Sequence, residues 1–149
     1  MRAVVERIAR GNVTVDNQIV GEIKRGLLVL LGVRHDDTEE DAVYLLEKIR
    51  GLRIFDDATG KMNLSLAETG GALLIVSQFT LFGDARRGRR PSYAQAAPPD
   101  RARSLYEFFV AKARAQIADV QTGIFQAMMQ IEIVNDGPVT ILLDSRRLF

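Results

Sequence analysis

Residues 26–33 read GLLVLLGV, a run in which every residue is apolar or glycine. A strand with one face in water alternates polar and apolar side chains, whereas an unbroken apolar run is typical of a strand covered on both faces. The run therefore predicts a central strand of a sheet, with other parts of the chain packed against each side.

Two helices are predicted in the segments that follow this strand. The first has a candidate N-cap at Asp37 or Thr38 and a stop at Gly51. The second opens at Pro98 and Pro99, because proline is tolerated in the first turn of a helix. Each helix carries one apolar stripe, formed by Ala42, Leu45, Leu46 and Ile49 in the first and by Leu105, Phe108, Phe109 and Ala113 in the second.

Short apolar stretches between turn-forming residues predict the remaining strands. They lie near residues 3–8, 13–15, 19–20, 52–55, 72–76, 128–134 and 139–143. Asp16-Asn17 is a predicted turn, and Asn135-Asp136-Gly137-Pro138 is predicted to join the last two strands. Many strands with two helices indicate one α+β domain over residues 1–149, with the helices packed on a mostly antiparallel sheet.

The composition, 47% apolar and 26% charged, is that of a soluble globular protein. The chain has no cysteine, which excludes disulfides and thiolate chemistry and fits a reducing cytosol. The first residues, MRAVVERIARGNVTV, alternate and carry charge throughout, so they match neither a signal peptide nor a membrane span. We therefore expect a cytoplasmic protein without a membrane partner.

The charge of the chain is nearly balanced but unevenly placed. A net charge of +1 argues against a protein that coats nucleic acid over its whole surface, and we expect no DNA partner. A local patch can still hold a few phosphates. The candidate patch consists of Arg86, Arg87, Arg89 and Arg90 in one glycine-containing loop, with Arg101 and Arg103 shortly after it.

Few of the residues that hydrolases commonly use are present. His35 is the only histidine, and no Gly-x-Ser-x-Gly motif is available to build a serine triad around it. His35, Asp36 and Asp37 could ligate an ion, but adjacent side chains on a turn rarely converge, and a solvated turn is the simpler interpretation. We expect neither a metal nor another cofactor. An enzyme of this composition would work with hydroxyls, amides, backbone groups and the substrate itself.

Two segments carry a specific resemblance to a known family. The first is Ser77-Gln78-Phe79-Thr80-Leu81-Phe82, with Gly83-Asp84 and Arg90-Pro91-Ser92-Tyr93 behind it, and the second is Asn135-Asp136-Gly137-Pro138-Val139-Thr140. Residues 2–7, 61–63 and 121–125 are also similar. Together they resemble the D-aminoacyl-tRNA deacylases from end to end, which implies a barrel-like core with two main helices and a homodimer. Phe82, where the family often has tyrosine, and Gln126, where glycine is common, depart from its pattern.

The resemblance implies that residues 77–80 form the catalytic site. Backbone amides around Phe79 and Thr80 would face the ester carbonyl and stabilise the oxyanion that develops there. Ser77 and Gln78 would orient the amine or the ribose of the substrate. Thr80 is a candidate nucleophile, but nothing nearby would deprotonate it, which favours a positioning role. Taken without the resemblance, the segment is a strand end in which serine and threonine cap local amides.

The second segment implies a device that selects substrates by handedness. By resemblance, the Gly137-Pro138 bond is cis and enters the pocket of the dimer partner. Its two carbonyls would then face the α-carbon of the substrate, so that an L side chain collides with them and a D side chain points into open space.

The resemblance also implies where the tRNA lies. Phe125 and Met129 would pack on the terminal adenine, although two more core residues are an equally good interpretation. The acceptor-stem phosphates would contact the loop arginines, for which a solvated basic loop is the alternative. These are Arg86, Arg87, Arg89 and Arg90.

The function so implied is hydrolysis of the ester of D-aminoacyl-tRNA, a proofreading step of translation that spares L-aminoacyl-tRNA. Glycyl-tRNA should also be cleaved, because glycine has no side chain to reject. The main alternative is a non-catalytic tRNA-binding or editing-accessory module on the same scaffold, and a third possibility is a hydrolase of an unrelated small ester.

Overall fold

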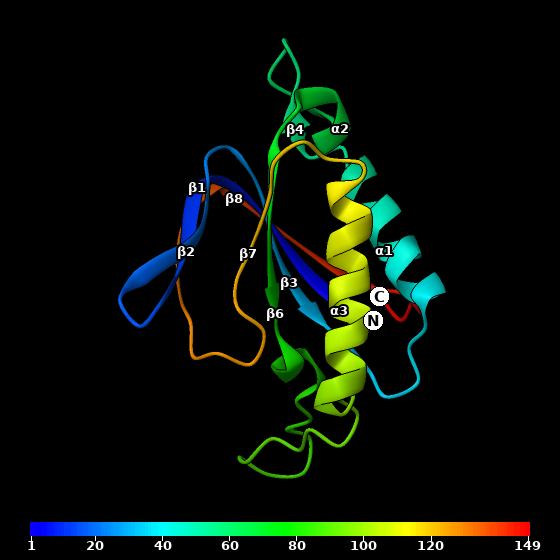
Figure 1. Ribbon diagram of the computed structural model, residues 1–149. Helices are drawn as coiled ribbons and strands as arrows, with labels where there is room; N and C mark the ends of the chain where they lie inside the picture. The colour runs from blue at the N-terminus through cyan, green and yellow to red at the C-terminus, as the bar shows by residue number, and fades with distance from the viewer.

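The computed structural model describes residues 1–149 and is built on a six-stranded sheet that curls into a nearly closed barrel, with two long helices against one side (Figure 1). The strand order is β2-β1-β3-β6-β7, and β8 also pairs with β1. The long strand β1 pairs with β3 through residues 2–8, with β2 through residues 11–15, and with β8 along most of its length. The strands of this sheet are β1 (Arg2–Val15), β2 (Gln18–Ile23), β3 (Gly26–Gly32), β6 (Ala72–Ser77), β7 (Val120–Thr122) and β8 (Gln130–Asp144).

Two long helices and several short elements complete the fold. The long helices are α1 (Glu39–Gly51) and α3 (Pro99–Arg114). A separate two-stranded ribbon consists of β4 (Phe55–Asp56) and β5 (Met62–Leu64), followed by the one-turn helix α2 (Leu66–Thr69). A 3-10 turn, η1 (Phe79–Phe82), directly follows β6. No helix is both long and apolar enough to cross a membrane.

Strand β3 lies in the centre, as its apolar run predicts. It pairs antiparallel with β1 and parallel with β6. Leu27, Val29 and Leu31 face the larger core, which fills the space beneath the helices, whereas Leu28 faces a second, smaller core on the opposite side of the sheet. Both faces of the strand are therefore covered, which explains why the run contains no polar residue.

The sheet is mixed, and its parallel part was not predicted. β6 pairs parallel with both β3 and β7, because the connections between these strands pass through α1 and α3. The barrel comes closest to closure where β2 approaches β7. At Gly21, a β-carbon would lie 2.5 Å from the carbonyl oxygen of Thr122, so only glycine allows this approach.

The two helices confirm the predicted stripes. α1 starts after the N-cap Thr38, which forms a capping box with Asp41, and its last residue is Gly51. α1 and α3 lie side by side over the sheet in Figure 1. Their inward-facing side chains join the larger core, and these are Ala42, Leu45, Leu46 and Ile49 from α1 with Leu105, Phe109 and Ala113 from α3. Phe108 of the second predicted stripe is only partly buried against this core.

Two predicted pairs of strands are each one long strand. Residues 2–15 form the single strand β1, and residues 130–144 form the single strand β8, with Gly137-Pro138 inside it. The prediction that residues 135–138 join two separate strands was wrong, because β8 pairs with β1 on both sides of this segment. Ile8 pairs with Asn135 and Glu6 with Thr140, so residues 136–139 bulge out of the ladder.

Candidate active site

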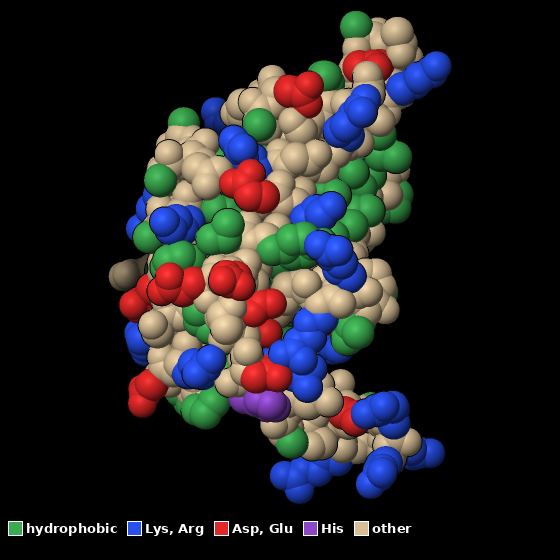
Figure 2. Space-filling view, turned by 90° about the vertical axis from the view of Figure 1, so that its right-hand side faces the viewer, with side chains coloured by type: hydrophobic (Ala, Val, Ile, Leu, Met, Phe, Trp, Pro, Cys, Tyr) green, Lys and Arg blue, Asp and Glu red, His purple; other side chains and the backbone are tan.

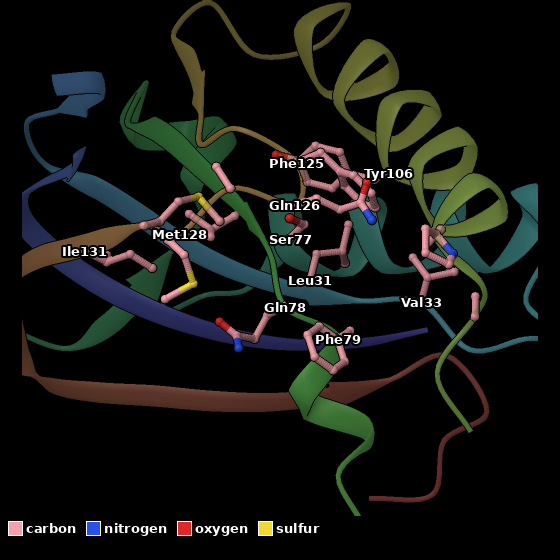
Figure 3. A pocket seen from close by; sticks show the side chains of 16 residues that line it. Leu31, Val33, Ser77, Gln78, Phe79, Tyr106, Phe125, Gln126, Met128 and Ile131 are labelled. Carbon is pink, nitrogen blue, oxygen red and sulfur yellow. The ribbon is translucent and has the colours of Figure 1, made fainter. Parts of the chain in front are cut away.

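A pocket of about 590 Å³ lies where the end of β6 faces α3 and residues 125–131. Its volume is in the range of small-molecule sites. Twelve of its sixteen lining residues are hydrophobic, so the few polar groups in its wall determine what it can orient. Figure 3 shows Ser77 between Phe125 and Tyr106 on one side and Gln78 and Phe79 on the other.

The first signature lies at the pocket because β6 ends there. Ser77 is the last residue of β6, and the amide of Gln78 still donates to the carbonyl of Leu31 on β3, at 2.8 Å. The chain then turns into η1, whose first two amides, those of Phe79 and Thr80, have no acceptor within the turn. The structure thus fixes these two N–H groups at the end of a buried strand.

Not all four predicted catalytic residues line the pocket. Ser77, Gln78 and Phe79 do, whereas Thr80 is exposed and lies outside the lining. The Thr80 hydroxyl accepts a hydrogen bond from the side-chain amide of Gln78. This contact ties Thr80 to a pocket residue, and no base approaches its hydroxyl.

An aromatic pair extends the wall at Phe79. The Phe79 ring is 58% exposed and meets the ring of Tyr93 edge-on, with centroids 5.1 Å apart. Tyr93 is held in place by the base of the arginine loop, where Asp84 and Ser92 exchange backbone hydrogen bonds of 2.8 and 2.9 Å. Tyr93 is the last residue of the first signature, and its contact with Phe79 gives that spacing a structural reason.

Phe125 and Tyr106 form the opposite wall. Their rings are tilted, with centroids 5.7 Å apart. The buried Tyr106 hydroxyl donates to the carbonyl of Ile75 at 2.9 Å, which fastens α3 to β6 two residues before Ser77. Burial raises the pKa of Tyr106 to about 12, so its phenol remains a neutral donor. Sequence reasoning missed this contact because Tyr106 lies within a predicted helix and matches no motif.

Residues 125–129 bring both predicted adenine-binding side chains into the pocket lining. Met129 lies over Gly123, where a β-carbon would be 2.5 Å from its sulfur. Between the two, Gln126 has a φ of 65°, a left-handed conformation that glycine adopts at no steric cost. A glutamine here, where glycine is common in the family, therefore holds the backbone in a conformation that is strained for any residue with a β-carbon.

Gly137-Pro138 is cis, and it lies outside the pocket of its own chain. Both residues are exposed on β8. The carbonyl just before them, that of Asp136, accepts a hydrogen bond of 2.9 Å from the side chain of Arg7. The pair thus projects from the surface on a fixed support.

Arg7 supports the segment that carries Gly137-Pro138, and sequence reasoning missed this contact. Arg7 is 5% exposed, and it also donates to the carbonyl of Ile54 at 2.7 Å and pairs with Asp56 at 3.3 Å. Arg7 continues the inward-facing alternation of Ala3 and Val5 along β1. A charged residue at a core-facing position was the available signal, because such residues are almost never buried without partners.

The four loop arginines differ in their partners. Arg86 makes two charge-assisted bonds to Asp84, at 2.9 and 2.6 Å, and this pairing holds the pKa of the Asp84 carboxyl down to about 2. Arg87, Arg89 and Arg90 are exposed and form no ion pair. In Figure 2, lysine and arginine side chains gather on the projection at the lower end of the molecule, where Figure 1 shows this loop.

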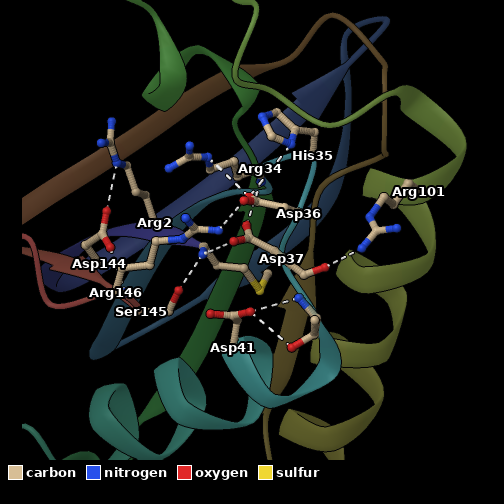
Figure 4. Close-up of polar contacts among 12 residues, drawn as sticks. Arg2, Arg34, His35, Asp36, Asp37, Asp41, Arg101, Asp144, Ser145 and Arg146 are labelled. Atoms are coloured by element: carbon tan, nitrogen blue, oxygen red, sulfur yellow. Dashed lines mark hydrogen bonds and ion pairs between the residues drawn. The ribbon is translucent and has the colours of Figure 1, made fainter.

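The sequence around the lone histidine forms a network of polar contacts (Figure 4). His35 is half exposed and lies 3.8 Å from Asp36, and Asp36 also contacts Arg34 and Arg146. The hydrogen bond from Arg146 lowers the pKa of Asp36. Asp37 is fully buried and accepts from the backbone amide of Arg34 at 2.6 Å. These carboxylates therefore connect segments of the fold, and none of them lines the pocket.

Comparison with known proteins identifies the family. The model of the D-Tyr-tRNA(Tyr) deacylase family matches residues 4–144. D-aminoacyl-tRNA deacylases from Koribacter versatilis and Kosmotoga olearia are 62% and 61% identical to this chain, and each alignment covers the full length of both proteins. The chain therefore belongs to the D-Tyr-tRNA(Tyr) deacylase family, as its two signatures predicted.

Two solved structures share the fold. A protein described as "c-Myc DNA Unwinding Element Binding Protein" superposes with a TM-score of 0.92 at 38% identity, over 97% of this chain and 98% of that one. A second, described as a "probable eukaryotic D-amino acid tRNA deacylase", has a TM-score of 0.84 at 20% identity and covers 95% of this chain and 97% of its own. The curved mixed sheet with two helices is thus common to these proteins.

Proposed function

We propose that this protein hydrolyses the ester bond of D-aminoacyl-tRNA and releases tRNA and the free D-amino acid. The observation that carries the proposal is the end of β6, where the family's first signature lines an apolar pocket with Ser77, Gln78 and Phe79. The near-identical length and high identity of the bacterial relatives support the same activity. Because aminoacyl-tRNA is made and used in the cytoplasm, we place the reaction there.

The chemistry follows from the groups at the end of β6. Water adds to the ester carbonyl, and the negative charge that develops on its oxygen is stabilised by the free amides of Phe79 and Thr80. The bond to the ribose oxygen then breaks, and this oxygen takes a proton as the carboxylic acid leaves. An aminoacyl ester is activated and has a vicinal hydroxyl beside it, so positioning and oxyanion stabilisation suffice without a strong base. Thr80 acts in this scheme as a positioning residue.

Selection by handedness is assigned to Gly137-Pro138 of a second subunit. In one chain these residues project from β8, and no residue of β8 except Asp144 is buried. A 15-residue strand with this much exposed surface is a natural interface between two copies. A wall of main-chain groups from the partner would exclude an L side chain by collision and leave a D side chain free. It would accept many D-amino acids and also glycine.

The direct test is deacylation of tRNA charged with D-tyrosine, L-tyrosine or glycine, with a free D-tyrosine ester as a fourth substrate. The proposal expects cleavage of the D and glycyl esters on tRNA, protection of the L ester, and slow turnover of the free ester. A non-catalytic tRNA-binding module would bind all three charged tRNAs and cleave none. A hydrolase of small esters would cleave the free ester as fast as the tRNA-linked one.

The description of one solved relative as a DNA-binding protein raises DNA as a competing ligand. Our expectation of no DNA partner is tested by competition of a duplex with tRNA at physiological salt. The exposed arginine loop would give weak, salt-sensitive binding to any polyanion. DNA that displaces tRNA at equal concentration would contradict the expectation.

A further inference from the structure

A second hollow, of about 290 Å³, lies on α3 directly behind the pocket wall. Tyr106 and Phe125 line both hollows, so these two rings form a common partition. The charged residues that line the second hollow are Arg103, Glu107 and Arg114, which leaves it one positive charge in excess. A site next to the pocket, with a positive wall, is suited to an anionic group of the ligand that enters the pocket.

Arg103 is the residue that joins the partition to this hollow. Its guanidinium lies over the Phe125 ring, 4.8 Å from the centroid. One of its nitrogens donates to the side-chain oxygen of Gln126 at 3.2 Å, and another lies 3.9 Å from the Glu107 carboxylate. A guanidinium has five N–H groups, so most remain free, and the side chain is 48% exposed. Arg103 is therefore held in place by its contacts with Phe125 and Gln126, and several of its N–H groups remain free to bind a ligand.

The chemistry of a 3′-terminal nucleotide sets where its phosphate emerges. The ester is on the 3′ side of the ribose and the phosphate is on the 5′ side, so the two leave the sugar in different directions. If the ester faces Ser77–Thr80 and the base lies on Phe125, the 5′ phosphate leaves the pocket on the side of Phe125, where Arg103 is exposed.

We propose that Arg103, braced on Phe125 and Gln126, binds the 5′ phosphate of the terminal nucleotide. This inference rests on the proposed placement of the terminal adenosine in the pocket. Arginine suits the task because its planar fork can make two bonds to one phosphate while its face remains against an aromatic ring. The phosphate would thereby fix the nucleotide along its length, with the ring of Phe125 between the base and the guanidinium.

The experiment uses two small substrates that differ only in this phosphate, 3′-O-(D-tyrosyl)-adenosine and its 5′-monophosphate. With the unmodified protein, the phosphate should raise kcat/KM. Arg103→Gln should remove most of this gain, about tenfold, so that the ratio of kcat/KM between the two substrates falls toward one. The loss should lie in KM. Arg103→Lys, which keeps the charge, should recover part of it.

Two further variants separate the inference from its premise. Lys112→Gln removes a charge from the same helix outside the hollow and should leave the phosphate gain intact. Phe125→Ala should lower kcat/KM for both substrates, since it removes the surface on which the base lies. If Phe125→Ala changes neither, the placement of the adenosine is wrong. If Phe125→Ala lowers kcat/KM for both substrates, and Arg103→Gln also lowers both by the same factor, then Arg103 only supports the Phe125 ring and the phosphate assignment is wrong.

Discussion

Gln126 shows how one residue can bear on both stability and binding. Its backbone is left-handed, a conformation that brings the β-carbon of an L residue close to the carbonyl oxygen. This close approach typically costs about 1–2 kcal/mol. The same side chain accepts the hydrogen bond that holds Arg103 over Phe125. The residue therefore combines a strained backbone with a contact that orders the pocket wall.

Gln126→Gly should raise the free energy of unfolding by about 1 kcal/mol, because glycine adopts this φ without strain. Gln126→Ala is the matched control, since it also loses the contact with Arg103 but keeps the strain. Urea denaturation at neutral pH measures both. A glycine variant no more stable than the alanine variant would show that the backbone there is not strained.

Tyr106 makes the pH dependence of one buried group measurable. Its pKa is raised from 10.0 to about 12 because burial disfavours the phenolate. Between these values the unfolded chain loses this proton and the folded chain keeps it, so the contribution of Tyr106 to stability is complete below pH 10 and is lost as the pH rises toward 12. Subtracting the phenolate absorbance of Tyr106→Phe from that of the unmodified protein should leave one transition near pH 12. A difference curve with its midpoint near pH 10 would mean that the phenol is accessible to water.

At the scale of the elements, the approach of β2 to β7 depends on one glycine. A β-carbon at Gly21 would meet a main-chain oxygen of Thr122, which has little freedom to move within the sheet. Gly21→Ala should therefore lower the free energy of unfolding by about 1–3 kcal/mol. Gly51→Ala at the end of α1 is the control, because a β-carbon there meets nothing within 4 Å. Equal effects of the two substitutions would show that the barrel tolerates a wider opening.

In the arginine loop, only Arg86 forms an ion pair, with Asp84, so the four arginines should contribute unequally to tRNA binding. Replacement of Arg87, Arg89 and Arg90 by glutamine should weaken tRNA binding and lower the slope of log affinity against log salt by up to about 1 per arginine in contact with a phosphate. Arg86→Gln should have a smaller effect, since Asp84 already binds its guanidinium. Filter binding at several salt concentrations measures both, and an unchanged slope in the triple variant would exclude the loop from the interface.

The elements also mark where sequence reasoning was sufficient. Local patterns gave α1, α3 and β3, because each has a complete apolar face and clear ends, such as Thr38 and Gly51 for α1. They did not give the parallel pairing of β6 or the unbroken length of β8, because strand pairing depends on segments far apart in the chain.

The two motif-bearing segments predicted residues that the fold brings together. Ser77, Gln78, Phe79, Phe125 and Met129 all line one pocket, although they come from two distant segments. The supporting contacts were not predictable, because they exist only once the chain has folded. Arg7 beneath Asp136 and Tyr106 on Ile75 are the two examples.

At the scale of the whole molecule, the proposed site has two parts, the pocket and Gly137-Pro138. In one chain the two lie apart, so the proposed selection by handedness requires a second subunit. Strand β8 presents apolar side chains outward, including Leu142, which is 56% exposed. The protein should therefore sediment as two chains of 16.6 kDa each.

Leu142→Lys should shift the equilibrium between dimer and monomer toward the monomer and should lower the rate of deacylation. The far-ultraviolet circular dichroism should not change, because the Leu142 side chain is exposed in the single chain. Ile19→Lys, at a position on β2 that is 59% exposed, is the control and should remain dimeric. Full activity in a monomeric Leu142→Lys protein would mean that each pocket is complete within one chain.

The most direct test of the account is the ratio of kcat/KM for D-tyrosyl-tRNA and L-tyrosyl-tRNA made from the same tRNA. Exclusion of the L side chain by a rigid main-chain wall should cost at least about 2.7 kcal/mol, which corresponds to a ratio of about 100 or more. Comparable hydrolysis of the two charged tRNAs would contradict it.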